Sequence, residues 1–502
     1  MSDTLSFGER VRKALIWRSG TQVFAQLISW GSTLAVIRIL DPADYGLFAM
    51  TQVVLVFLSF LNGYGLASSI IQTEKLDPLR LRQAFGALLA LNGGLAVMQF
   101  MLAPWVAEYY RQPIIADLLQ VQAFIYLATP FIVLPEAVMA RELEFKKTAL
   151  VNLLSAAVGA IVALSCALSG LGVWTLVYAA IAIFWTQGIG LFLSAKMFIW
   201  PSFNFRGSKD MFTFGGTILL AHVMWTIQSQ SDIFIGSRVF TPHELGLYAE
   251  ALFLTTIFTA KFVPPLNEVA FPAYSRMQSD PEGIRLAFLK AVRLIMMIAC
   301  PLYFGMAVTA PELVSVVLGE KWLAMAPIIA VLAIVMPLLT LQILFAPLNN
   351  AMGHPEISLR TTMVGAVVMS LAFLIGVQFG IMGLAYAWLG GFPLVTAATY
   401  LLSKRHLDLR AVDLVRAIWP GLCAATVMAG VTYLARAALW SLPELALLGI
   451  CIASGILVYG STLYLMAKPA LLELIQLVFR RATAQSPEDR IDPAIANVHY
   501  NK

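Results

Sequence analysis

Charged side chains inside otherwise apolar runs are the residues of this chain most able to do chemistry. Glu250, Lys261 and Glu268 are separated by eleven and seven residues, so on an α-helix they fall within about 20° of one face. Charges inside a membrane span are costly and usually face a cavity or a partner. A cation between two carboxylates is suited to binding an anionic group and to exchanging a proton or Na⁺.

A second set of polar side chains lies on the first apolar segment. Arg18, Gln22 and Gln26 recur at every fourth position, and hydroxyl residues continue the pattern at 29 and 33. On a helix these five side chains span an arc of about 80°. This stripe favours the lining of a polar cavity, although hydrogen bonding between helices would use the same pattern.

The segment at 211–237 is the counterpart of the first segment and carries an acidic residue, Asp232. A carboxylate at that depth is poorly solvated and is able to bind Na⁺ or take up a proton. Asp232, Glu250 and Glu268 are therefore candidates for ion coupling, and a structural pairing of Asp232 with Arg238 is the alternative. Four further side chains share one broad face with Asp232: His222, Trp225, Thr226 and Ser229.

The second apolar segment adds Gln52 and Asn62 to this set. We expect the first, second, seventh and eighth segments to enclose a hydrated cavity lined by these polar residues. Arg18 and Lys261 would supply cations for a phosphate-type group, and amide, hydroxyl and aromatic side chains suit sugars. The sequence thus predicts an anionic ligand rich in hydroxyl groups.

One stretch of the chain occurs twice, as RILDPADYGLFA at Arg38–Ala49 and as RVFTPHELGLYA at Arg238–Ala249. Each copy predicts a helix start, with Asp41 or Thr241 as the N-cap and a proline at the first helical position. Glu244 would complete a capping box with Thr241. The repeat indicates two similar halves, and its two arginines are candidates for a gate or for contact with the departing anionic ligand.

The composition identifies an integral membrane protein. Of 502 residues, 60% are hydrophobic and 12% charged, against roughly 25% charged in globular domains. We predict an all-α fold of about fourteen transmembrane helices, two of whose boundaries are glycine turns, at Gly170–Gly172 and Gly380–Gly383. The apolar runs of about 20 residues or more fall near 15–39, 44–71, 83–106, 114–138, 148–169, 172–195, 211–237, 244–270, 287–310, 324–350, 359–379, 382–402, 415–436 and 445–467.

The placement of lysine and arginine predicts the orientation, because cytoplasmic loops are enriched in both. With the N-terminus in the cytoplasm, the outer side holds only five cations: Arg38, Arg111, Arg238, Lys321 and Arg436. An even number of spans then places both termini inside. Six helices separate the two copies of the repeat, which predicts parallel repeats with a substrate route between them.

The expected domain plan follows from these assignments. It has two six-helix bundles, a terminal helix pair, a short interfacial helix and a disordered tail. The boundaries are 1–14 for a cytoplasmic N-terminal segment, 15–200 and 211–403 for the bundles, 414–468 for the helix pair, 469–481 for the interfacial helix and 482–502 for the tail.

Motifs for several kinds of chemistry are absent from the sequence. It contains no phosphate-binding loop of the GxxxxGK[ST] type, no HExxH and no GxSxG. The four cysteines lie in apolar runs without metal-type spacing. We expect no enzyme activity, no metal site and no nucleic-acid partner.

The chain resembles the polysaccharide-transporter (Wzx/WzxC-like) family of lipid-linked oligosaccharide flippases, within the multidrug/oligosaccharidyl-lipid/polysaccharide exporter superfamily. The resemblance covers nearly all of residues 5–470. It departs at 222–230, where relatives look richer in Asn and Tyr and where Gln228 and Gln230 are candidate replacements. The matching stretches are Arg38–Met50, Arg141–Lys147, Gly172–Trp174, Asp232–Arg238, Leu245–Tyr248, Phe271–Gln278, Leu318–Trp322 and Gly353–Pro355.

The resemblance implies export of an undecaprenyl-diphosphate-linked oligosaccharide across the bacterial inner membrane by alternating access between inward-open and outward-open states. It implies no cofactor beyond H⁺ or Na⁺ as a coupling ion, and a polysaccharide polymerase and a chain-length regulator as partners. Arg18 falls where related lipid flippases place cavity arginines. Arg18, Lys261, Arg38 and Arg238 are the candidate pyrophosphate contacts.

Four alternatives stay open at this point. A drug or cation antiporter of the same fold would favour an acidic cavity, and a lipid II flippase would carry more arginines on the first two helices. A membrane polysaccharide polymerase or ligase would need a large outer loop, which the sequence lacks. A scaffold in an export complex would not translocate lipid-linked sugar.

Overall fold

The computed structural model describes residues 7–59, 61–62, 78–142, 144–204 and 216–480, and these contain helices and no β-strand. Twelve helical segments of this part are long and apolar enough to cross a membrane. The 33-residue α1 and the 21-residue α11 lie outside that set. The chain is thus an all-α multi-pass membrane protein, and the number of fourteen spans stays a prediction.

The helices before residue 205 are called here the first half, and those from residue 216 to residue 407 the second half. The first half holds α1 (Phe7–Ile39), α2 (Pro42–Ser59), α4 (Pro78–Tyr110), α5 (Ile114–Gln122), α6 (Phe124–Ala128), α7 (Pro130–Arg141), α8 (Phe145–Leu168) and α9 (Trp174–Ser194). The second half holds α11 (Gly216–Gly236), α12 (Pro242–Arg276), α13 (Pro281–Val308), α14 (Ala310–Val317), η1 (Glu320–Met325), α15 (Ala326–Ala351), α16 (Pro355–Gly376), η2 (Val377–Phe379) and α17 (Ile381–Leu407).

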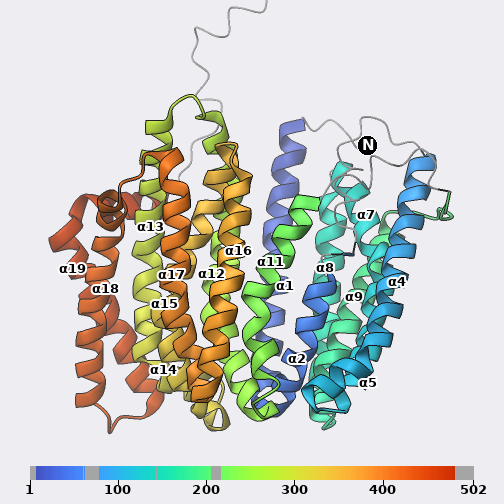
Figure 1. Cartoon of the computed structure of the whole chain (residues 1–502), viewed down its shortest axis with the longest axis horizontal. Helices are drawn as coiled ribbons and strands as arrows, with labels where there is room; N and C mark the ends of the chain where they lie inside the picture. The colour runs from blue at the N-terminus through green and yellow to red at the C-terminus, as the bar shows by residue number, and fades with distance from the viewer. Residues whose placement is uncertain (1–6, 60, 63–77, 143, 205–215, 481–502) are drawn as a thin grey trace, which may run out of the picture.

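The last two helices are α18 (Ala411–Ala438) and α19 (Glu444–Arg480). They lie at the edge of the molecule beside the second half, where α18 packs against α13 (Figure 1). Ala467 has non-helical angles, φ −145° and ψ 45°, so α19 is broken close to the predicted start of the interfacial helix at 469. The predicted tail at 482–502 lies outside the described residues, and α1 extends back into the predicted N-terminal segment.

Glycine turns separate the helix pairs whose boundaries were least distinct in the sequence. Gly170 and Gly172 have φ of 72° and 54° between α8 and α9, and Gly380 has φ of 76° before α17. A positive φ is strained for residues with a Cβ atom but open to glycine. Both predicted splits are therefore confirmed.

Consecutive prolines do not break α12. Pro264 and Pro265 each lack the N–H that would bond to the preceding turn, yet the helix is continuous from Pro242 to Arg276. The 35-residue α12 therefore runs from the repeated sequence to the other end of the second half.

The two copies of the repeated sequence lie at one end of the molecule, called here the repeat end, which is the lower end in Figure 1. The largest hydrophobic core cluster lies there and draws on both halves. It includes Ile37, Tyr45 and Met50 of the first half with Leu245 and Trp322 of the second. The halves are therefore joined by a common core at the repeat end.

Candidate functional site

The two halves come into backbone contact where α2 meets α12, at the two repeat glycines. A Cβ atom on Gly46 would lie 1.8 Å from the carbonyl oxygen of Pro242, and one on Gly246 would lie 1.7 Å from that of Pro42. The two contacts are reciprocal, since each glycine meets the first residue of the other helix. Only glycine allows this approach, and it explains the glycine in both copies.

The repeat arginines also cross between the halves. Arg38 donates from Nε to the Val317 carbonyl oxygen at 2.9 Å and from its terminal nitrogen to that of Val316. Arg238 donates to the Tyr109 carbonyl oxygen at 2.6 Å and lies over the Tyr109 ring. The last carbonyls of a helix have no partner in their own helix and carry partial negative charge. Each arginine therefore caps a helix C-terminus of the opposite half, α14 or α4.

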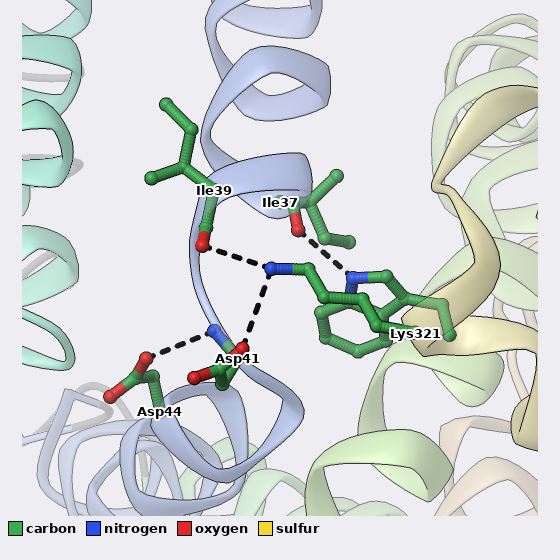
Figure 2. Close-up of polar contacts among 6 residues, drawn as sticks. Ile37, Ile39, Asp41, Asp44 and Lys321 are labelled. Atoms are coloured by element: carbon green, nitrogen blue, oxygen red, sulfur yellow. Dashed lines mark hydrogen bonds and ion pairs between the residues drawn. The ribbon is translucent and has the colours of Figure 1, made fainter.

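A third contact joins the turn between α1 and α2 to η1 (Figure 2). Lys321 Nζ lies 2.9 Å from the Ile39 carbonyl oxygen and 3.5 Å from Asp41 Oδ1, and Trp322 Nε1 donates to the Ile37 carbonyl oxygen at 2.9 Å. The motif Leu318–Trp322 was identified in the sequence, but its role as a bridge was not.

The helix starts differ between the copies. At the second copy the capping box is confirmed: the Glu244 N–H donates to Thr241 Oγ1 at 3.3 Å, and the Thr241 N–H donates to Glu244 Oε2 at 2.9 Å. At the first copy the Asp41 N–H donates to Asp44 Oδ2 at 3.1 Å, while the Asp41 side chain faces Lys321 (Figure 2). In the first copy the N-cap side chain therefore contacts the other half and does not cap its own helix.

Asp232 is fully buried on α11 and accepts a hydrogen bond from another helix. The Tyr248 hydroxyl donates to Asp232 Oδ2 at 2.8 Å, and Trp388 Nε1 donates to the Tyr248 oxygen at 2.8 Å. The chain of bonds ties α11, α12 and α17 together. The alternative pairing of Asp232 with Arg238 is wrong, because the Asp232 oxygens accept from Tyr248 and the Ile233 N–H, and Arg238 bonds to the Tyr109 carbonyl oxygen. Tyr248 lies in the repeated sequence, but its role as a donor was not predicted, and Trp388 was not singled out, since aromatic residues in apolar helices are ordinary core residues.

The three charged residues predicted on one face of α12 do not form a single site. Glu250 is half-buried, one turn past Gly246. Lys261 and Glu268 are exposed and make no hydrogen bond or ion pair within the described part of the chain. At a rise of 1.5 Å per residue, Lys261 lies about 16 Å along the helix from Glu250. Glu250 therefore lies at the contact between halves, apart from Lys261.

The structure describes only part of the polar stripe predicted on α1. The Arg18 side chain is outside what the structure describes, although its backbone belongs to α1. Gln22 lines a cavity of about 220 Å³ within the first half, together with Glu136 of α7 and Asn152 of α8. Gln26 is half-buried. Glu136 is a carboxylate inside an apolar helix that the sequence analysis missed, although its charge in such a run was a visible signal.

The polar face predicted on α11 divides between two cavities. Trp225 and Ser229 line one of about 550 Å³ within the second half. Thr226 is buried and lines a mostly apolar groove of about 940 Å³ between α2 and α4 of the first half and α11 and α16 of the second. His222 is exposed. On α2, Gln52 is half-buried, and Asn62 is buried after the helix end, where its carbonyl oxygen accepts from Asn92.

The described residues contain no group of three or more His, Cys, Asp or Glu side chains able to hold a metal ion. The free cysteines in this part of the chain include Cys300 and Cys451, both buried. The candidate functional side chains in the described part of the chain are those that join the halves and those that line the cavities.

Comparisons with known proteins agree with this architecture. Residues 35–327 match the family model described as "Polysaccharide biosynthesis protein". The chain is 22% identical over 370 residues to the teichuronic acid biosynthesis protein TuaB of Bacillus subtilis (strain 168), covering 70% of this chain and 72% of that one. It is 24% identical over 375 residues to the lipopolysaccharide biosynthesis protein WzxC of Escherichia coli (strain K12), covering 73% and 74%.

The fold is similar to that of a solved membrane transporter. A structure titled "Lipid II flippase MurJ, inward closed conformation" superposes with a TM-score of 0.71 at 12% sequence identity, covering 93% of this chain and 100% of that chain. At this identity the likeness shows the fold alone. The family model spans more than half of the chain, including both copies of the repeated sequence, and the chain therefore belongs to the polysaccharide biosynthesis protein family of membrane proteins.

Proposed function

We propose that this protein is a flippase that moves a polyprenyl-diphosphate-linked oligosaccharide from the cytoplasmic to the outer leaflet of a bacterial inner membrane. The family and the names of the relatives support a role in polysaccharide biosynthesis. A polymerase and a chain-length regulator would act on the exported units.

The contact between the halves is the observation that carries the proposal. Reciprocal glycine contacts and two arginine caps close the molecule at the repeat end through a few directional bonds. Such a joint is able to open as a unit, as alternating access requires. The positive-inside rule would place this end outside.

In this proposal the lipid diphosphate enters from the opposite end. Lys261, exposed and without a partner in the described part of the chain, and Arg18 would neutralise the pyrophosphate. The polyprenyl tail would stay in lipid. Opening of the repeat end would release Arg38 and Arg238 from their carbonyl partners and present them to the departing diphosphate.

The proposal is tested by polymer export in a cell that depends on this protein. Lys261→Ala and Arg18→Ala should each abolish export while leaving the amount of protein in the membrane unchanged. Arg416→Ala is the matched control, because Arg416 is an exposed cation on α18, outside both halves. Normal export in both the Lys261→Ala and the Arg18→Ala variant would overturn the assignment of the pyrophosphate site.

Translocation by the purified protein separates this function from its rivals. Vesicles containing the protein alone should move a fluorescent lipid-linked oligosaccharide between leaflets. A scaffold would move none, and a polymerase would lengthen the sugar chain.

A further inference from the structure

The cavity of about 550 Å³ within the second half is large enough for a small organic ligand and too large for a bare ion. It is lined from five helices, α11, α12, α15, α16 and α17. None of its lining residues is charged. The first half contains a smaller cavity of about 220 Å³ that includes the carboxylate of Glu136, so the two halves are unlike in this respect.

The lining is rich in hydrogen-bond acceptors that have no partner. Gln342 is 9% exposed, and its Oε1 makes no hydrogen bond. Asn267 donates to the Ile343 carbonyl oxygen at 3.3 Å, which leaves its Oδ1 unpaired. Burying a polar atom without a partner is costly. These two oxygens on α15 and α12 therefore indicate a ligand that brings donors.

The threonine hydroxyl groups of the cavity also offer acceptors and not donors to a ligand. Thr256, Thr362 and Thr399 each donate to a backbone carbonyl four residues earlier, at 2.8, 2.7 and 2.9 Å. With the donor used, each oxygen offers lone pairs to a ligand. The ligand should thus carry several hydroxyl groups and no net charge.

Aromatic side chains complete the cavity. Trp388 and Phe392 are stacked with ring centroids 5.2 Å apart, and Trp225 is 37% exposed on the opposite helix α11. Aromatic faces pack against the C–H groups of sugar rings, while amide oxygens accept from sugar hydroxyls. Trp388 also begins the hydrogen-bond chain to Asp232.

We infer that this cavity is a subsite for one or two uncharged sugar units of the lipid-linked substrate, read by Gln342 and Asn267. The inference rests on the proposed function and assigns its sugar recognition to the second half alone. The diphosphate is bound elsewhere, so sugar recognition and diphosphate binding are separable by substitution.

The test compares two lipids on the full-length protein in detergent by native mass spectrometry: undecaprenyl diphosphate, and the same lipid carrying a disaccharide of neutral hexoses. Wild-type protein should prefer the disaccharide lipid by about tenfold, the effect of a few neutral hydrogen bonds. Gln342→Leu and Asn267→Leu should remove the preference and leave binding of the sugar-free lipid unchanged.

Gln99→Leu is the matched control, since Gln99 is a buried glutamine of α4 whose Oε1 is also unpaired. It should keep the tenfold preference. If both Leu variants of the cavity keep it too, or if wild-type protein binds both lipids equally, the subsite is wrong while the proposed function stands. If wild-type protein binds neither lipid, the proposed function itself fails. Binding of tetraphenylphosphonium that Gln342→Leu abolishes would assign the cavity to organic cations instead.

Discussion

Gly46 and Gly246 meet at the crossing of α2 and α12, each against the backbone of the other helix, at the point where the two copies of the repeated sequence come together. A methyl group has no space there, because both neighbours are backbone atoms. The glycine pair thus sets how closely the halves approach at the repeat end.

Gly46→Ala and Gly246→Ala should force α2 and α12 apart and favour opening of the repeat end. Distances between spin labels on α2 and α12, measured by pulsed electron resonance, should lengthen in both variants. Gly31→Ala is the control, because a Cβ atom at Gly31 meets nothing within 4 Å. An unchanged distance distribution in the two repeat variants would contradict a steric role for the pair.

Arg38→Gln and Arg238→Gln should weaken the closed repeat end, each by about 1 kcal/mol, or roughly fivefold in the equilibrium between closed and open forms. Each substitution removes the charged donors to a helix C-terminus of the other half. Reaction of a single cysteine at this end with a membrane-impermeant thiol reagent would report the opening. Arg111→Gln serves as the comparison, since the Arg111 side chain makes no hydrogen bond or ion pair within the described residues; an equal effect there would point to a general loss of charge.

Thr241→Ala should destabilise the protein by about 1 kcal/mol, the usual cost of losing an N-cap. It removes the hydroxyl oxygen that accepts from the Glu244 N–H, while the backbone N–H of residue 241 keeps its bond to Glu244 Oε2. Asp41→Ala should cost the start of α2 less, because the Asp41 side chain contacts Lys321 in place of its own helix. Thermal unfolding in detergent measures the stability of both variants. A larger loss of stability for Asp41→Ala than for Thr241→Ala would contradict the assignment of Thr241 as the residue that caps its own helix.

The sequence predicts much of the fold because membrane helices depend on local composition. The apolar runs, the glycine turns at Gly170 and Gly380, and the capping box at Thr241 are each encoded within a few residues. The repeated sequence also predicts the two halves. The halves meet at the end that carries the repeated sequence, and no other feature of the sequence indicates that end.

The site was harder to predict because it depends on contacts between distant segments. Helical spacing aligned Glu250 with Lys261, but it gave no distance along the helix and no neighbour for either. Asp232 was found by its charge, whereas its partners Tyr248 and Trp388 resemble ordinary core residues. Gln342 and Asn267 were polar residues on apolar helices, a signal present in the sequence and not used.

Asp232 and Tyr248 provide the last prediction, which separates stability from ion coupling. Tyr248→Phe removes the donor to a fully buried carboxylate and the acceptor of Trp388. Leaving such groups unpaired costs about 1–3 kcal/mol each, so this variant should unfold at a clearly lower temperature. Asp232→Asn keeps an oxygen acceptor for Tyr248 and loses only the acceptor of the Ile233 N–H, so it should be destabilised less than Tyr248→Phe. If Asp232 is the coupling carboxylate, translocation by Asp232→Asn in vesicles should lose its dependence on an imposed H⁺ or Na⁺ gradient. Retention of the wild-type gradient dependence would restrict Asp232 to holding α11, α12 and α17 together, and would leave Glu250, at the contact between halves, as the stronger candidate.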